Sequence, residues 1–158
     1  MDIRYDEWLP GPGLEGIVTA YWRVVGEAPK VPSPAILPDG YVELVLNLGD
    51  PVELEGPGYT GYQPDRTVVG LLSRAVRMRY GARVHTFGIR FHPTRGAGFL
   101  GQTAPTLTDK LLPLAQVRHP LDRTFAQLVV KNEKNLETDA GRSALDRPPP
   151  AASFGSSS

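Results

Sequence analysis

Cysteine is absent from this chain of 158 residues. This excludes a disulfide framework and thiolate metal sites, and it fits a reducing compartment. An excess of charge of one sign is also lacking, because 17 Lys and Arg residues balance 17 Asp and Glu residues. Domains that grip a phosphate backbone usually carry a basic excess. We therefore expect no direct nucleic-acid binding by this chain.

Long apolar runs are missing as well. No stretch approaches the roughly 18 residues that a membrane-spanning helix needs. Residues 1–7 are polar and acidic, unlike a signal peptide. We therefore expect a cytoplasmic protein with no membrane partner, and the length predicts one domain with a core of its own.

Sequence motifs for phosphate binding and for nucleophilic hydrolysis are also lacking. The glycines between Gly88 and Gly101 form neither G-x-x-x-x-G-K-S/T nor a strand-framed G-x-G-x-x-G. Ser33, Ser73 and Ser143 lack a nucleophile-elbow motif. We therefore expect a binding domain that is not an enzyme, with no catalytic residues and no cofactor.

Glycine (17 residues) and proline (16 residues) are, by contrast, abundant. Breakers at this density prevent long helices over most of the chain and favour short strands joined by turns. Residues 6–13 read as irregular and residues 56–64 as a loop. Alternating apolar side chains predict strands over 17–25, 41–48, 67–72, 76–80 and 84–91, with a short strand over 52–54.

Helical patterns follow these strands. Residues 93–100 predict a short helix that opens with a proline. A longer helix is predicted over 121–136 from one apolar stripe. Beyond it, residues 137–158 lose periodicity and are expected to be a disordered tail or linker. The predicted fold is mainly β: a β-barrel or sandwich over residues 1–136 that ends in one or more C-terminal helices, of the α+β class.

Four segments, taken together, resemble the N-terminal domain of AraC-type transcription regulators. Residues 37–49 read LPDGYVELVLNLG, which is similar to the "LPDG…ELVFNLG" segment of those domains. Residues 69–73 (VGLLS), 87–93 (FGIRFHP) and 107–114 (LTDKLLPL) agree in the same order. The resemblance spans roughly residues 15–136.

This resemblance implies a cupin-like β-barrel that senses a small effector, mediates dimerisation, or does both. In such regulators a separate C-terminal domain with two helix-turn-helix motifs binds DNA. The sequence after Leu136 has no helix-turn-helix spacing. We therefore expect the sensing part of a regulator without its DNA-binding part. Two alternatives stay open, namely a metal-dependent cupin enzyme and an interaction domain without a ligand.

Strand alternation assigns several large side chains to the interior of the predicted barrel. A barrel of this size can hold one small ligand, and aromatic side chains with polar tips are the usual lining. The alternative is an interior filled by these same side chains. The candidate ligand-binding residues are Trp22, Leu46, Met78, Tyr80, His85 and Phe87.

A metal site is the second hypothesis, with His85, His92 and Glu43 as ligands. Two observations disfavour it, and we predict no metal. The closely spaced His-x-His pattern of catalytic cupins is absent. His85 and His92 are seven residues apart, so they point to opposite faces of an unbroken strand.

Arginines suggest two further sites. Arg74, Arg77, Arg79 and Arg83 could attract an anion, although a solvated strand face explains them better in a neutral domain. Arg90 could hold a carboxylate ligand with its two-pronged guanidinium. The structural alternative, which we favour, pairs Arg90 with Asp39, Glu43 or Asp109.

The C-terminal stripe could pack on the barrel or on a second copy of the chain. The resembling regulators often dimerise through helices after the barrel. Asn132 interrupts the stripe, as polar residues at self-pairing interfaces sometimes do. The candidate homodimer interface is Leu121, Phe125, Leu128 and Val129.

Overall fold

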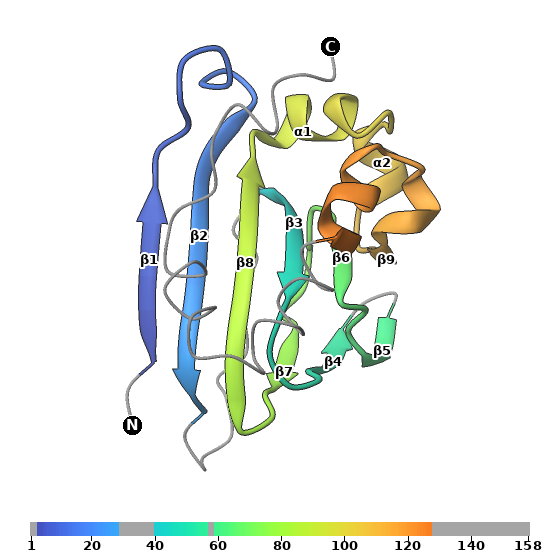
Figure 1. Cartoon of the computed structure of the whole chain (residues 1–158). Helices are drawn as coiled ribbons and strands as arrows, with labels where there is room; N and C mark the ends of the chain where they lie inside the picture. Colours follow the sequence, from blue (N-terminus) through green and yellow to red (C-terminus); the bar gives the residue numbers. More distant parts are fainter. Residues whose placement is uncertain (1–2, 29–39, 57–58, 128–158) are drawn as a thin grey trace.

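The chain folds mainly into antiparallel β-strands, as the sequence predicts. A computed structural model describes residues 3–28, 40–56 and 59–127 (Figure 1). The strands in this part are β1 (Arg4–Trp8), β2 (Val18–Glu27), β3 (Val42–Asn47), β4 (Glu53–Gly56), β5 (Tyr59–Tyr62), β6 (Arg66–Val69), β7 (Arg77–Arg79), β8 (Arg83–Phe91) and β9 (Leu111–Pro113). The helices are α1 (Pro93–Phe99), α2 (Ala104–Leu107) and the 3-10 helix η1 (Leu114–Val117), and residues 121–127 are also helical.

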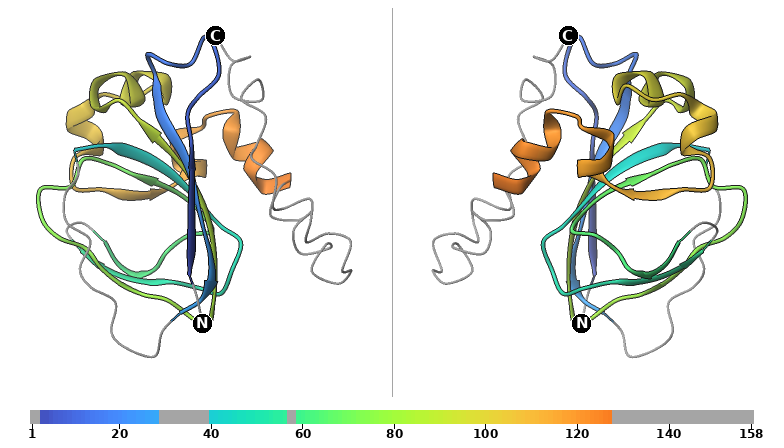
Figure 2. Two further views of the ribbon diagram at one scale, coloured as in Figure 1. Left: turned by 90° about the vertical axis from the view of Figure 1, so that its left-hand side faces the viewer. Right: turned by 90° about the vertical axis from the view of Figure 1, so that its right-hand side faces the viewer.

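Within the described ranges the strands form two antiparallel sheets that do not close into a barrel. The larger sheet has six strands in the order β1-β2-β8-β3-β6-β9, and the smaller has three in the order β5-β4-β7. Helices α1 and α2 cover the end of the larger sheet at which β8 finishes (Figure 1). The smaller sheet and the helical segment 121–127 lie on opposite sides of β1 and β2 (Figure 2). The arrangement is therefore closer to a sandwich than to a barrel.

One face of the larger sheet carries the main hydrophobic core. Leu46 lies opposite Phe87, and Leu44 lies opposite Ile89, across the β3–β8 pair. Tyr21 of β2 stacks on Phe87, with 6.3 Å between ring centroids. The helices complete this core with Ala97, Leu100, Leu107, Leu114, Val117, Leu121 and Phe125.

The opposite face of the larger sheet packs against the smaller sheet. Val52, Leu54, Val76 and Leu111 form a second buried cluster there, and Met78 and Tyr80 pack on it. Side chains point alternately to the two faces of a strand. The central strands therefore bury both odd and even positions. The larger sheet is covered on both sides at its centre.

Close packing at Gly70 joins the strands to the helices. This glycine follows β6, and a Cβ atom there would lie 1.6 Å from the carbonyl oxygen of Leu107 in α2. No other residue fits without moving the backbone. The Gly70 N–H donates to the Lys110 carbonyl oxygen at 2.9 Å, which fixes the chain just before β9.

The described half of the predicted C-terminal helix packs on the main core of its own chain. Leu121 is 5% exposed and Phe125 is fully buried. The Phe125 ring meets Phe87 edge-on, with 6.5 Å between centroids. Arg66 of β6 donates to the Asp122 carboxylate at 2.7 Å and to its carbonyl oxygen at 3.1 Å. Two of the four candidate interface residues therefore hold the helix to its own sheet. Leu128 and Val129, like the predicted tail, lie outside the described residues.

In the part of the chain that the structure describes, no helix has the length and apolar character needed to cross a membrane.

A histidine lies at the start of this last helical segment. The Leu121 N–H donates to His119 Nδ1 at 3.1 Å, and the imidazole ring packs on Phe99 with 4.9 Å between centroids. Burial lowers the pKa of His119 below its ordinary value of 6.5, and a hydrogen bond with the Phe99 backbone offsets only part of this. The folded chain therefore favours the neutral imidazole, whose unprotonated Nδ1 accepts the Leu121 N–H.

We expect this histidine to make stability depend on pH. Its pKa is lower in the folded state, so below about pH 6.5 the unfolded chain binds more protons than the folded one. Stability from this group is complete above that pH and falls as the pH drops below it. Thermal melts between about pH 7.5 and pH 5.5 should show the fall. His119→Gln should flatten the curve in this window. An equal fall in the His119→Gln variant would contradict the assignment.

Candidate functional site

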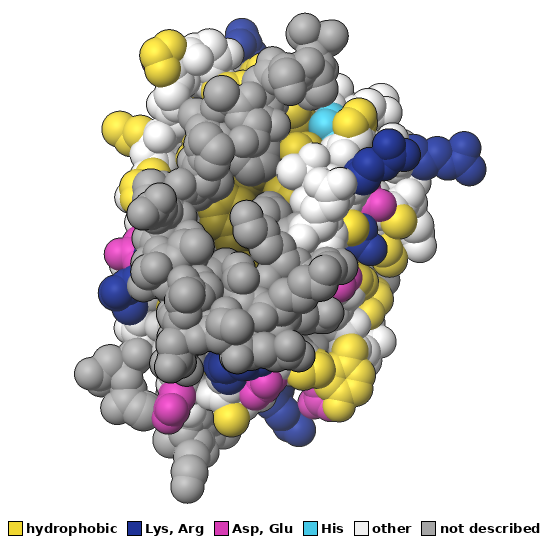
Figure 3. All heavy atoms as spheres, in the orientation of Figure 1, with side chains coloured by type: hydrophobic (Ala, Val, Ile, Leu, Met, Phe, Trp, Pro, Cys, Tyr) yellow, Lys and Arg dark blue, Asp and Glu magenta, His cyan; other side chains and the backbone are white. Residues whose placement is uncertain are grey.

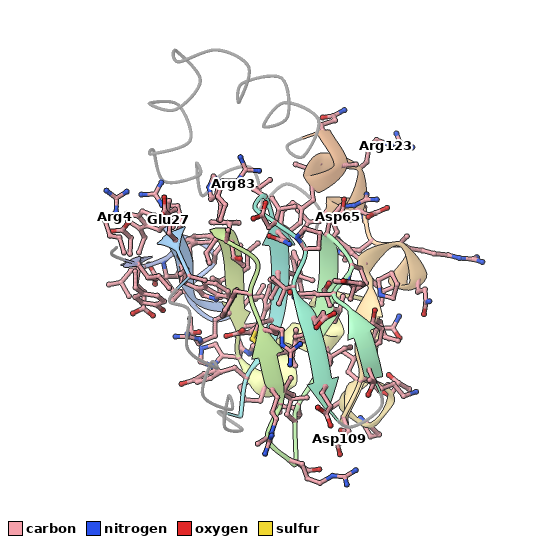
Figure 4. All side chains as sticks on the ribbon, turned by 90° about the horizontal axis from the view of Figure 1, so that it is seen from below. Arg4, Glu27, Asp65, Arg83, Asp109 and Arg123 are labelled. Carbon is pink, nitrogen blue, oxygen red and sulfur yellow. The ribbon has the colours of Figure 1, made fainter. Side chains whose placement is uncertain are left out.

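An apolar cavity of about 110 Å³ lies between the two sheets. Seen from below, the strands form two layers (Figure 4), and the residues around the cavity come from both. The larger sheet and its connections contribute Trp22, Val24, Tyr41, Glu43, Val45, Val69, Gly70, Thr86 and Leu111. The smaller sheet and the segments next to it contribute Leu54, Gln63, Leu72, Val76, Met78 and Tyr80.

The floor of the cavity is a row of paired residues on three neighbouring strands. Trp22 of β2 lies opposite Gly88 of β8, and Gly88 lies opposite Val45 of β3. The Trp22 indole covers Gly88 so closely that a Cβ atom there would lie 2.0 to 2.4 Å from three ring atoms. A glycine at position 88 therefore allows a flat aromatic ring to lie on the sheet.

The roof comes from the smaller sheet. Leu54 of β4 pairs with Met78 of β7, and both line the cavity. The Tyr80 hydroxyl donates to the Met78 sulfur at 3.7 Å. Burial raises the pKa of the Tyr80 phenol above its ordinary value, so the hydroxyl stays protonated at neutral pH. The roof is therefore uncharged.

One ion-pair network, which includes the lining residue Glu43, forms a charged rim beside the cavity. Arg90 Nε donates to Glu43 Oε1 at 3.1 Å, and Arg90 Nη1 donates to Glu7 Oε1 at 3.0 Å. The guanidinium also lies over the Tyr41 ring, 5.4 Å from its centroid. Burial acts to lower the pKa of Arg90, but hydrogen bonds with Glu43 and Tyr5 raise it overall. Arg90 is therefore charged and held by side chains of its own sheet.

The other two predicted partners of Arg90 fall elsewhere. Asp109 accepts hydrogen bonds from the Ser73 N–H at 2.7 Å and the Ser73 hydroxyl at 2.5 Å. These bonds lower the pKa of the Asp109 carboxyl. Asp39 lies outside the described residues. Of the three carboxylates proposed from the sequence, Glu43 is the one that the structure places on Arg90.

Three of the six candidate ligand-binding residues line the cavity, namely Trp22, Met78 and Tyr80. Leu46 and Phe87 instead point into the main core on the other face of the larger sheet. His85 shares the face of Phe87 and is half-buried, opposite Val25 of β2. The sequence interpretation assumed one interior. The sheet has two buried faces, so residues of opposite parity were assigned to one site.

Several lining residues went unrecognised in the sequence. Glu43 and Val45 alternate with Leu44 and Leu46, so apolar side chains occur at both parities of β3. A strand that is apolar on both faces is typical of a sheet buried on both sides. The apolar residues at both parities of β3 therefore indicate a second buried face, although they do not show that a cavity lies there.

The three metal ligands proposed from the sequence do not form one cluster. Among the residues that the structure describes, no three His, Asp or Glu side chains are grouped to hold a metal ion. Glu43 accepts a hydrogen bond from Arg90. His92 follows the last residue of β8 and precedes α1.

The arginine cluster around β7 forms part of a mixed surface. Arg79 lies 3.6 Å from the Glu53 carboxylate, and Arg83 lies 3.9 Å from that of Asp50. Positive and negative side chains occur together along the lower edge of the molecule (Figure 3). Exposed pairs of this kind contribute little to stability. The two neighbouring acids agree with the solvated-face interpretation.

Fold and cavity together define a mainly β domain with one candidate binding site between two sheets. The chain belongs to the family described as a domain of unknown function (DUF6597), which matches residues 6–113. That match includes each of the described residues that line the cavity. Searches of curated proteins and of solved structures gave no match.

Proposed function

We propose that this chain is a ligand-sensing domain that binds a small effector between its two sheets, in the manner of the N-terminal domain of an AraC-type regulator. The observation that carries the proposal is the apolar cavity of about 110 Å³ with aromatic side chains in its wall. Pockets for small ligands are typically concave and mostly apolar, with a few polar groups. This one has that composition.

The segments that resemble AraC-type regulators support the proposal by their positions. They contain β3 and β9, the second half of β8 and the last residue of β6. In the larger sheet these strands are neighbours, in the order β8-β3-β6-β9. The similar segments, far apart in the sequence, thus lie on four neighbouring strands of the six-stranded sheet and form part of the cavity wall.

The helical segment 121–127 contacts two strands that also line the cavity, so a change in the cavity could alter its position. Thr86 of β8 lines the cavity, and the next residue, Phe87, contacts Phe125 on the reverse face. Val69 of β6 lines the cavity too, while Arg66 of the same strand bonds Asp122. An effector that prefers one position of these strands would shift the helix through them. Homodimerisation, with Leu121, Phe125, Leu128 and Val129 as its candidate residues, stays a proposal.

We propose binding and not catalysis, because the acid at the rim, Glu43, is held by Arg90. The lack of cysteine agrees with a cytoplasmic location.

A melting screen tests the sensing role. An effector present at about 100 times its Kd stabilises the folded state by about 2.7 kcal/mol. For a chain of this size that raises the melting temperature by roughly 5 to 10 °C. Small metabolites should include at least one compound with this effect. The Val45→Phe variant, which places a ring inside the cavity, should lose the shift.

Val25→Phe is the matched control. It adds the same atoms to the opposite face of the sheet, where Val25 lies opposite His85, and should keep the shift. If no compound raises the melting temperature, or if Val45→Phe responds like the wild type, the sensing proposal is wrong.

A further inference from the structure

We infer that the cavity selects a compact, uncharged, mainly apolar compound and rejects organic anions, and that Glu43 sets this selectivity. The inference rests on the proposed function, because it assumes that the cavity is a ligand site. It adds the chemical class of the ligand, and it follows from the size, the charge and the polar groups of the cavity wall.

Size restricts the ligand to about one ring. The cavity measures about 110 Å³. An apolar cavity of about 150 Å³ in another protein takes up benzene. A six-membered ring with one small substituent therefore fills the space between the sheets, and a larger ligand would extend beyond the cavity or displace the half-buried Trp22 and Tyr80.

Charge in the wall disfavours an anion. Among the described residues that line the cavity, Glu43 is the one charged side chain. A carboxylate ligand would be desolvated beside a carboxylate of the protein, which is unfavourable without a cation to pair with it.

The nearby arginines do not supply that cation. Arg90 bonds both Glu43 and Glu7, so two carboxylates share one guanidinium. Arg77 and Arg79 flank Met78 on β7 and are exposed. Since Met78 lines the cavity, strand alternation turns these two side chains away from it.

Two neutral polar side chains in the wall indicate which polar group the ligand carries. Gln63 and Thr86 line the cavity and are 8% and 7% exposed. An amide and a hydroxyl can donate to or accept from an uncharged polar group. The wall therefore fits a ring or a branched chain that carries one hydroxyl, carbonyl or amide group.

Three ring compounds of equal size test this class: benzyl alcohol, benzoate and benzylammonium. The chain has two tryptophans, so its ¹H–¹⁵N NMR spectrum contains two indole N–H signals. The signal that remains in the Trp8→Phe variant is the one from Trp22. We expect benzyl alcohol to shift the Trp22 signal saturably. Benzoate should bind at least about tenfold more weakly. Benzylammonium should also bind more weakly than the alcohol, because the Glu43 carboxylate is already paired with Arg90 and the ammonium group would lose its hydration.

The Glu43→Gln variant tests whether the negative charge of Glu43 causes the preference for the uncharged compound. The amide keeps the shape and an oxygen for Arg90, but removes the negative charge. Benzoate should gain affinity relative to benzyl alcohol in this variant, with a melting temperature near that of the wild type as the check on folding.

The outcomes distinguish the sensing role of the cavity from the chemical class of its ligand. If either ion binds as tightly as benzyl alcohol, or if Glu43→Gln leaves the preference unchanged, the class inference is wrong and the sensing role stands. If none of the three compounds shifts the Trp22 signal saturably but a metabolite in the melting screen still raises the melting temperature, the class inference is wrong and the sensing role stands. If no compound has either effect, both proposals fail.

Discussion

Phe125→Ala should lower the free energy of unfolding by about 3 to 5 kcal/mol, the usual cost of removing a buried phenylalanine ring. Phe125 is fully buried and meets Phe87 edge-on. Its removal leaves a void beneath β8, on the reverse side of the cavity floor. Denaturant unfolding followed by circular dichroism measures the change.

Asp122→Ala on the same helical segment is the control. Its side chain is 26% exposed and pairs with Arg66, and partly exposed ion pairs are usually worth about 0 to 1 kcal/mol. A loss below about 1 kcal/mol for Phe125→Ala would mean that the helix does not pack on the sheet as described. The proposed route from the cavity to the helix would then be lost.

Gly88→Ala should destabilise the chain by about 1 to 3 kcal/mol, as expected for overpacking a well-filled site, and should abolish the effector response. The new methyl group would overlap the Trp22 ring, because three indole atoms lie 2.0 to 2.4 Å from its position. The ring must therefore leave the sheet, and the neighbouring space into which it can move is the cavity. Unfolding measurements and the Trp22 indole signal report the two effects.

A double-mutant cycle shows whether the indole causes this effect. In a Trp22→Leu background the shorter side chain leaves room for the methyl group, so Gly88→Ala should cost much less there. Neighbouring residues that share one space typically couple by about 0.5 to 3 kcal/mol. Equal destabilisation in both backgrounds would show that the backbone, and not the ring, demands glycine.

Strands with a clear apolar pattern were predictable from the sequence. The pattern over residues 41–48 and 84–91 predicts β3 and β8, and the structure confirms both. β1 was missed, because a strand at the edge of a sheet is largely solvated and Arg4–Trp8 has three charged residues and no apolar alternation. β9 has three residues, too few to show a period.

The site was only partly predictable, for a geometric reason. Alternation along a strand separates Phe87 from Gly88, but it does not say what covers each face. Trp22 and Phe87 were assigned to one interior, although Trp22 lies opposite Gly88 and Phe87 points to the other side. The cavity exists only because the smaller sheet packs over the larger one. This packing brings Leu54 and Met78 of the smaller sheet to the same cavity as Trp22 and Val45 of the larger sheet.

Diffraction from crystals held under xenon gas tests the central claim most directly, because an apolar cavity of this size takes up xenon. We predict xenon density between the two sheets, bounded by Trp22, Val45 and Leu54, and its loss in Val45→Phe. Side chains filling this space in the wild type, or xenon bound elsewhere and not between the sheets, would contradict the account.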